Sequence, residues 1–242
     1  MSAAQKALDA QMLNPAAIFD LGKSELRELN AALQTLPPST NQTIWTILNP
    51  RGSHALAVGV TANVEISIEG HAGYYCAGMN DGAAITINGN AGTGVAENMM
   101  SGLVHVKGDA SQSAGATAHG GLLVIDGNAA ARCGISMKGI DIVVKGNAGH
   151  MSAFMAQSGS LVICGDAGEA LGDSIYEARI FVKGKVASLG ADCEVKEMDA
   201  EDVEILSALL AKAGSTDKPE EFTRYGSARN LYHFHVDNAG AY

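Results

Sequence analysis

A glycine recurs every 19 residues through the middle of this 242-residue chain. Each copy stands one residue after a short strand-like run that contains branched aliphatic residues, and several copies open the tile "GNAG" or a close variant of it. A strict period of this length predicts a solenoid, in which each copy forms one coil and neighbouring coils stack. The seven glycines are Gly70, Gly89, Gly108, Gly127, Gly146, Gly165 and Gly184.

The residues around each glycine indicate what the coil is made of. The positions two and four before it are Ile, Leu or Val in all seven copies, and the residue directly before the glycine is mostly polar. This alternation is typical of a β-strand with one face inward. Two positions after the glycine stands Ala in six copies and Val in the last, which predicts a tight inner corner. We therefore predict an all-β solenoid, a right-handed parallel β-helix of about seven to eight 19-residue coils. A left-handed hexapeptide helix is disfavoured, because 19 is not a multiple of six.

The glycine tile resembles a phosphate-binding loop only superficially. Such a loop normally occurs once, between a strand and a helix, whereas this tile occurs seven times. We predict that the seven glycines are structural turns that use φ values closed to other residues. The separate "GKS" at 22–24 is not a P-loop either, because Ala17 occupies the position of the required first glycine.

An open stack of coils needs a cap at each end. We predict an N-terminal helical cap and linker over residues 1–48, with Ser24 as the helix N-cap. The parallel β-helix is expected over 49–195, and a C-terminal helix and aromatic docking tail over 196–242. In the C-terminal helix, Asp199 is the expected N-cap and Gly214 the stop, with Val203, Leu206 and Leu210 on one face.

Composition removes several classes of function. The net charge of −10, without a basic stripe, argues against binding to nucleic acid or an anionic membrane. No apolar run approaches 18 residues and the first residues do not read as a secretory signal, so the cytoplasm is the expected location. The cysteines form no Cys-x-x-Cys pair, which favours reduced structural thiols over a zinc or iron–sulfur site. They are Cys76, Cys133, Cys164 and Cys193.

Neither carboxylates nor histidines gather into a site in the predicted stack. Glu69 and Asp126 are three coils apart, about 14 Å, and cannot share a metal ion. Cys76 and Cys133 are equally far apart. His105 has no carboxylate in its own column of stacked residues, and three further groups of histidines offer no complete ligand set: His71, His150 and the pair His233 and His235. We predict no catalytic, cofactor-binding or metal-binding residue in this chain.

One column of side chains is apolar in the later coils, although it points away from the core toward solvent. Three positions before the glycine, the later coils carry aliphatic or aromatic residues on the side that faces away from the core. Either the C-terminal helix and tail cover this stripe, or a partner protein does. Together with residues of the aromatic tail, the stripe forms a candidate partner interface: Val124, Val143, Val162, Phe181, Tyr232, His233 and His235.

The repeat from about Gly70 to Ala191 resembles the Gly-X-Gly-X-Gly β-helix domain of the glutamate synthase large subunit. A related stand-alone version occurs as one component of formylmethanofuran dehydrogenase. The flanks, "FDLGKSELRELNAAL" before the coils and "EDVEILSALLAKAG…RNLYHF" after them, are most similar to the stand-alone β-helix subunit of N-methylglutamate synthase.

This resemblance implies a non-catalytic scaffold subunit in a three-part enzyme. A glutamine-amidotransferase-like subunit and a subunit with FMN and an iron–sulfur cluster would carry the chemistry, which converts methylamine and L-glutamate to N-methyl-L-glutamate and ammonia. Met1-Ser2 offers no N-terminal cysteine nucleophile, and the chain has no flavin barrel. The alternatives are a component of a glutamate synthase or formylmethanofuran dehydrogenase complex, an independent carbohydrate-active β-helix enzyme, or a homo-oligomeric structural protein.

Overall fold

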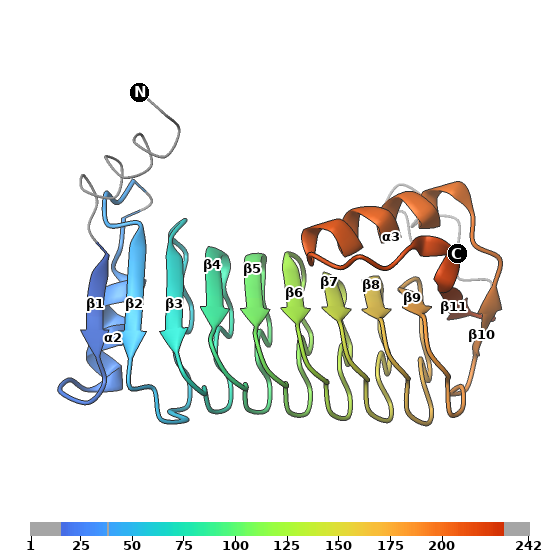
Figure 1. Cartoon of the computed structure of the whole chain (residues 1–242), viewed down its shortest axis with the longest axis horizontal. Helices are drawn as coiled ribbons and strands as arrows, with labels where there is room; N and C mark the ends of the chain where they lie inside the picture. Colours follow the sequence, from blue (N-terminus) through green and yellow to red (C-terminus); the bar gives the residue numbers. More distant parts are fainter. Residues whose placement is uncertain (1–15, 38, 230–242) are drawn as a thin grey trace, which may run out of the picture.

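A single sheet of eleven strands runs the length of the molecule (Figure 1). The computed structural model describes residues 16–37 and 39–229. Strands β1 to β9 are parallel and pair in sequence order, and residues 19 apart lie side by side from β3 to β9. The predicted parallel β-helix is thereby confirmed. The strands are β1 (Ala17–Asp20), β2 (Ile44–Leu48), β3 (Glu65–Glu69), β4 (Asp81–Ile87), β5 (Ser101–Val106), β6 (Leu122–Ile125), β7 (Lys138–Val144), β8 (Ser158–Ile163) and β9 (Arg179–Val182).

The core lies inside the coils, where the alternating aliphatic residues point. Ile85, Val104, Leu123 and their counterparts in the other coils are fully buried. The alanine column behaves as predicted, because each alanine pairs with the next through a parallel bridge, from Ala72 to Ala167 and then Val186. Each buried aliphatic side chain contributes roughly 1.5–3 kcal/mol, so the repeated pattern holds the stack together along its whole length.

The repeated glycines lie at the bend after each strand, but mostly for a different reason from the one predicted. Only Gly70 has a positive φ, at 136°, and the other six do not. Instead, a Cβ atom on Gly146 would lie 2.7 Å from the carbonyl oxygen of Gly127 in the preceding coil. The Gly146 N–H donates to that same oxygen at 2.9 Å. The glycine is therefore required because two backbones approach closely.

Left-handed backbone occurs elsewhere in the coil, often at residues that have side chains. In one coil, Met151, Ala153 and Met155 have φ of 56°, 58° and 53°. Their counterparts in neighbouring coils repeat this conformation at the same positions. An isolated residue there would be strained, so the inter-coil hydrogen bonds on both sides must hold this side of the coil in place.

The N-terminal segment extends the sheet as well as capping it. Helix α2 (Leu26–Gln34) buries Leu29 and Leu33 completely, and β1 and β2 on either side of it continue the sheet. The N-cap is Glu25 rather than the predicted Ser24, and its N–H donates to the Glu28 carboxylate at 3.3 Å.

The C-terminal segment closes the other end. Strand β11 (Thr223–Ser227) pairs antiparallel with both β9 and β10 (Cys193–Lys196), so the last parallel strand has no free edge. Helix α3 (Ala200–Lys212) begins at the predicted N-cap, since the Asp202 N–H donates to Asp199 at 2.8 Å. The short 3-10 helix η1 (Pro219–Glu221) follows. Val203 was expected on the buried face but is 41% exposed, and Leu209 is buried in addition to Leu206 and Leu210.

Candidate functional site

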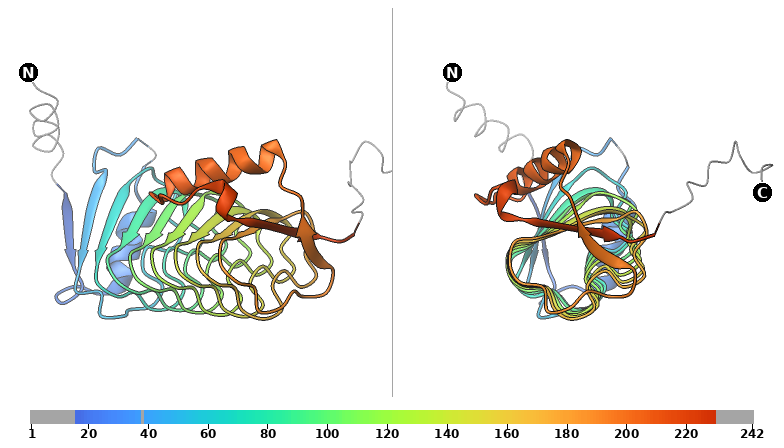
Figure 2. Two further views of the ribbon diagram at one scale, coloured as in Figure 1. Left: turned by 45° about the vertical axis from the view of Figure 1, so that its right-hand side comes forward. Right: turned by 90° about the vertical axis from the view of Figure 1, so that its right-hand side faces the viewer.

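The outer face of the sheet is divided into a covered half and an open half (Figures 1 and 2). Helix α3 lies over β6 to β9, where its leucines form a second apolar cluster with the outward column of the sheet. The members of that column are all at most 1% exposed: Val124, Val143, Val162 and Phe181. The prediction of a direct partner contact at these four residues is therefore wrong, because the chain's own helix covers them. Tyr232, His233 and His235 lie outside the described residues.

Ion pairs hold α3 on the sheet at its first turn. The Asp202 carboxylate is buried at 2% exposure, with Arg179 Nε at 3.2 Å and Arg224 Nε at 3.4 Å. These contacts are close enough for ion pairs but lack the alignment of hydrogen bonds. Arg179 also lies 2.9 Å from Glu201. Because a buried carboxylate without a cation is costly, this arrangement fixes where the helix begins on the sheet.

A second anchor follows the end of α3. Lys183 lies 2.6 Å from Asp217 and 3.1 Å from Glu221, and the Ser215 hydroxyl donates to Asp217 at 2.9 Å. The hydrogen bond from Lys183 outweighs burial and lowers the pKa of Asp217. Burial and the neighbouring Asp217 raise the pKa of the Cys164 thiol to about 12. The thiol is protonated at neutral pH and is not an activated nucleophile.

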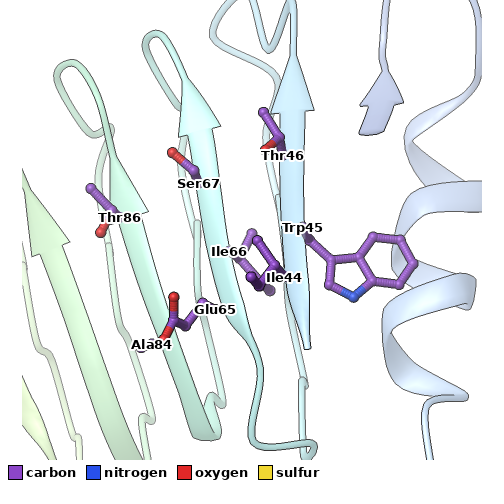
Figure 3. A pocket seen from close by; sticks show the side chains of 8 residues that line it. All are labelled: Ile44, Trp45, Thr46, Glu65, Ile66, Ser67, Ala84 and Thr86. Carbon is purple, nitrogen blue, oxygen red and sulfur yellow. The ribbon is translucent and has the colours of Figure 1, made fainter. Parts of the chain in front are cut away.

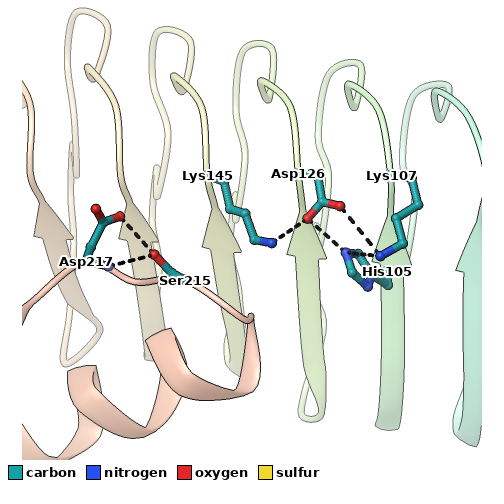
Figure 4. Close-up of polar contacts among 6 residues, drawn as sticks. All are labelled: His105, Lys107, Asp126, Lys145, Ser215 and Asp217. Atoms are coloured by element: carbon teal, nitrogen blue, oxygen red, sulfur yellow. Dashed lines mark hydrogen bonds and ion pairs between the residues drawn. The ribbon is translucent and has the colours of Figure 1, made fainter.

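At the boundary of the two halves, three nitrogen-bearing side chains converge on one carboxylate (Figure 4). Asp126 Oδ1 lies 2.9 Å from His105 Nε2 and 2.8 Å from Lys145 Nζ, and Lys107 Nζ is 3.6 Å from Asp126 Oδ2. Burial by itself raises the pKa of Asp126, but the hydrogen bonds from Lys145 and His105 and their charge outweigh it, so the pKa lies below its usual value. The network ties β5, β6 and β7 together.

The two lysines stand in the same column as Asp126, directly before successive glycines, and only His105 lies in a different column. His105 stands three positions before its glycine and Asp126 one position before the next glycine, so the two are diagonal neighbours on adjacent strands. Long side chains reach across such diagonals. The signal in the sequence is the Lys-Asp-Lys alternation at positions 107, 126 and 145, together with a histidine offset by two residues on the adjacent coil.

Replacing Asp126 with Asn is expected to lower the free energy of unfolding by about 1 kcal/mol at pH 7, because the variant loses a partly buried ion network. Since the pKa of Asp126 is depressed in the folded state, its stabilisation is present above the ordinary carboxyl pKa near 4 and fades as pH falls through the folded value. Urea unfolding at pH 7 and at low pH measures both effects.

Asp109→Asn is the matched control for that experiment. Asp109 Oδ1 accepts the Asn128 N–H of the next coil at 2.7 Å. One and two coils further on, Asn128 and Asn147 each use their own Oδ1 to accept the corresponding N–H of the coil that follows. An amide at position 109 keeps the acceptor, so its effect should be within about 0.5 kcal/mol. Equal losses in the two variants would contradict the role given to the Asp126 network.

The open half of the outer face covers β2 to β5. Its central column consists of Thr46, Ser67, Thr86 and His105, in register across the strands. A shallow depression of about 210 Å³ opens here (Figure 3). Glu65, on its lining, is exposed and has no hydrogen-bond or ion-pair partner for its carboxylate among residues 16–37 and 39–229. The lining is Ile44, Trp45, Thr46, Glu65, Ile66, Ser67, Ala84 and Thr86.

The other residues considered as candidates have structural surroundings. Cys76 and Cys133 are fully buried in the core, and burial raises the pKa of each thiol to about 12. His71 Nδ1 accepts the Asn90 N–H at 2.9 Å, which places it in the ladder of stacked turn residues. In the part of the chain that the structure describes, no three His, Cys, Asp or Glu side chains are grouped as metal ligands. None of the described helices has the length and apolar character needed to cross a membrane.

Comparison with known proteins gives one informative result. No protein-family model matches the chain. The chain is 64% identical over 226 residues to protein GlxC of Rhizobium meliloti (strain 1021), an alignment that covers 93% of this chain and 99% of that protein. Identity at this level over nearly both full lengths extends to the coils and to both flanks.

Proposed function

Because the chain belongs to the family of protein GlxC, we propose that it is a glutamate-synthase-related subunit, and specifically the non-catalytic scaffold of an N-methylglutamate synthase in the cytoplasm. The assembly converts methylamine and L-glutamate to N-methyl-L-glutamate and ammonia. In this proposal, a partner subunit with FMN and an iron–sulfur cluster and a glutamine-amidotransferase-like partner carry the chemistry. The stacked coils hold these partners in a fixed arrangement.

One observation carries the scaffold role: the charged clusters on the outer face hold the chain itself together. Asp126 joins three strands, while Asp202 and Asp217 hold the two ends of α3 to the sheet. Such groups stiffen the stack and keep its outer face in a defined shape. The resemblance of the coils to the β-helix domain of glutamate synthase supports the type of complex, and the match over 99% of GlxC indicates that this relative consists of the same stack and flanks.

The proposal predicts that the tagged full chain, made in cells that also make its natural partners, is recovered with a flavoprotein and an amidotransferase-like subunit. The recovered assembly should show flavin absorbance and form N-methylglutamate from methylamine and glutamate. The chain purified alone should do neither. Native mass spectrometry, absorbance and product analysis measure the three outcomes.

The alternatives give different results in the same experiment. Glutamine-dependent glutamate formation would indicate a glutamate synthase, and molybdenum or tungsten in the assembly would indicate a formylmethanofuran dehydrogenase. Recovery of the chain only with copies of itself, or turnover of a carbohydrate by the chain alone, would overturn the proposed function.

A further inference from the structure

The covered half of the outer face shows how this sheet accepts a helix. One column of outward residues lies beside the central column and runs through every strand from β2 to β9. In the covered half, one charged residue of this column forms ion pairs with α3. Arg179 lies 2.9 Å from Glu201 and 3.2 Å from Asp202, while Asp141, the other charged residue there, accepts the Ser160 N–H at 3.1 Å. The full column is Ile44, Glu65, Ala84, Leu103, Leu122, Asp141, Ser160 and Arg179.

The open half continues the same column without the opposite charge. Glu65 stands in it, and its carboxylate has no cation within ion-pair distance among the described residues. Strands β2, β3 and β4 carry the acids Glu65, Glu69 and Asp81 and no Lys or Arg. His105 on β5 and Lys107 directly after it contact Asp126 instead. The open half therefore has an excess of negative charge.

The open half also has the size and the mixed polarity that a helix needs. Neighbouring strands lie about 4.8 Å apart, so β2 to β5 span about 14 Å, the same as β6 to β9 under α3. A 13-residue helix is about 20 Å long. Ile44, Ala84 and Leu103 offer apolar surface, and the hydroxyls of Thr46 and Thr86 border the depression beside Glu65.

We propose that a basic amphipathic helix of a partner subunit lies across β2 to β5, in line with α3. A Lys or Arg of that helix pairs with Glu65, with its alkyl stem in the depression, and apolar residues pack on Ile44, Ala84 and Leu103. This inference rests on the proposed scaffold function and assigns its docking surface. The charges of the Arg179 contact are reversed here: the sheet supplies the acid and the helix supplies the base.

The test uses the full chain in its natural assembly. Glu65→Lys should weaken recovery of the partner subunit at least tenfold, because a like charge replaces the ion-pair partner at a contact. Glu169→Lys is the matched control: it is an exposed acid that makes the same charge change beyond the alanine corner, away from the strand face. It should leave recovery unchanged. Circular dichroism should show that both variants remain folded.

A photo-crosslinking residue at position 86 identifies the occupant directly. Mass spectrometry should find the crosslink on a Lys- or Arg-rich helical segment of the partner, and reversing that segment's contacting base to Glu should restore binding to the Glu65→Lys chain. Crosslinks to a second copy or to residues 1–15 of the same chain would overturn the inference, as would normal recovery with Glu65→Lys. If the wild-type chain recovers no flavoprotein at all, the proposed function fails together with the inference; if it does and Glu65→Lys behaves normally, only the inference fails.

Discussion

Replacing Val143 and Val162 together with aspartate is expected to release α3 from the sheet while the coils stay stacked. Both valines are fully buried between the sheet and the helix leucines. A carboxyl group at either position loses its contact with water and faces apolar side chains, which costs at least about 3 kcal/mol per site. The inner core is on the opposite side of the same strands, where Ile142 and Leu161 are unchanged.

Limited proteolysis and thermal unfolding measure this effect. In the double variant, cleavage within residues 197–215 should become fast, while the fragment that contains the coils survives with its β-type circular dichroism. Val203→Asp is the control, since Val203 is on the same helix but 41% exposed, and it should leave the cleavage rate close to that of the wild type. Protection of α3 in the double variant would contradict the packing described here.

The coils could be predicted from the sequence because each pattern that defines them links residues within one coil or in adjacent coils. The inward aliphatic pairs, the alanine corner and the 19-residue register recur in every copy, so seven independent repeats agree on one structure. The caps are partly local as well. The side chain of Asp199 and the N–H of Asp202 are three residues apart, and a helix start can be identified at that range.

The surface could not be predicted to the same depth, because it depends on contacts distant in sequence. The apolar column required a cover, but nothing in the sequence chose between α3 and a partner. Which face of α3 is buried, with Leu209 on it and Val203 exposed, depends on how the helix sits on the sheet, and the Asp202 ion pairs that hold it there join distant residues. The pairing of β11 between β9 and β10 also joins distant segments, and its strand has no 19-residue counterpart.

The glycine tile shows how a correct pattern led to a wrong physical reason. Gly is expected where φ is positive, yet residues such as Met151 and Met155 adopt positive φ here, and six of the seven repeated glycines do not. Repetition itself explains both facts. Identical coils at a short spacing bring identical backbone atoms together, so a Cβ is excluded at the point of closest approach, and hydrogen bonds from both neighbours hold left-handed residues elsewhere.

Gly146→Ala is therefore expected to cost about 3 kcal/mol of folding free energy, although alanine can adopt the backbone conformation of this residue. The added methyl group would lie 2.7 Å from the Gly127 carbonyl oxygen and 2.6 Å from Asn128 Oδ1. Moving it away would stretch two bonds between these coils, from the Gly146 N–H to Gly127 and from the Asn147 N–H to Asn128. Overpacking against atoms that are fixed in this way is at the upper end of its usual range.

Gly214→Ala separates this steric cost from the conformational one. Gly214 has a φ of 66°, and a Cβ there would meet nothing within 4 Å. The alanine variant therefore loses only the roughly 1–2 kcal/mol that a left-handed backbone conformation costs a residue with a Cβ. Urea unfolding of the two variants gives the steric cost and the conformational cost as losses in the free energy of unfolding, which can be compared directly. If close approach between coils is the constraint, Gly146→Ala is the more damaging change; a larger loss in Gly214→Ala would mean that conformational freedom dominates and that neighbouring coils can move apart to admit a methyl group.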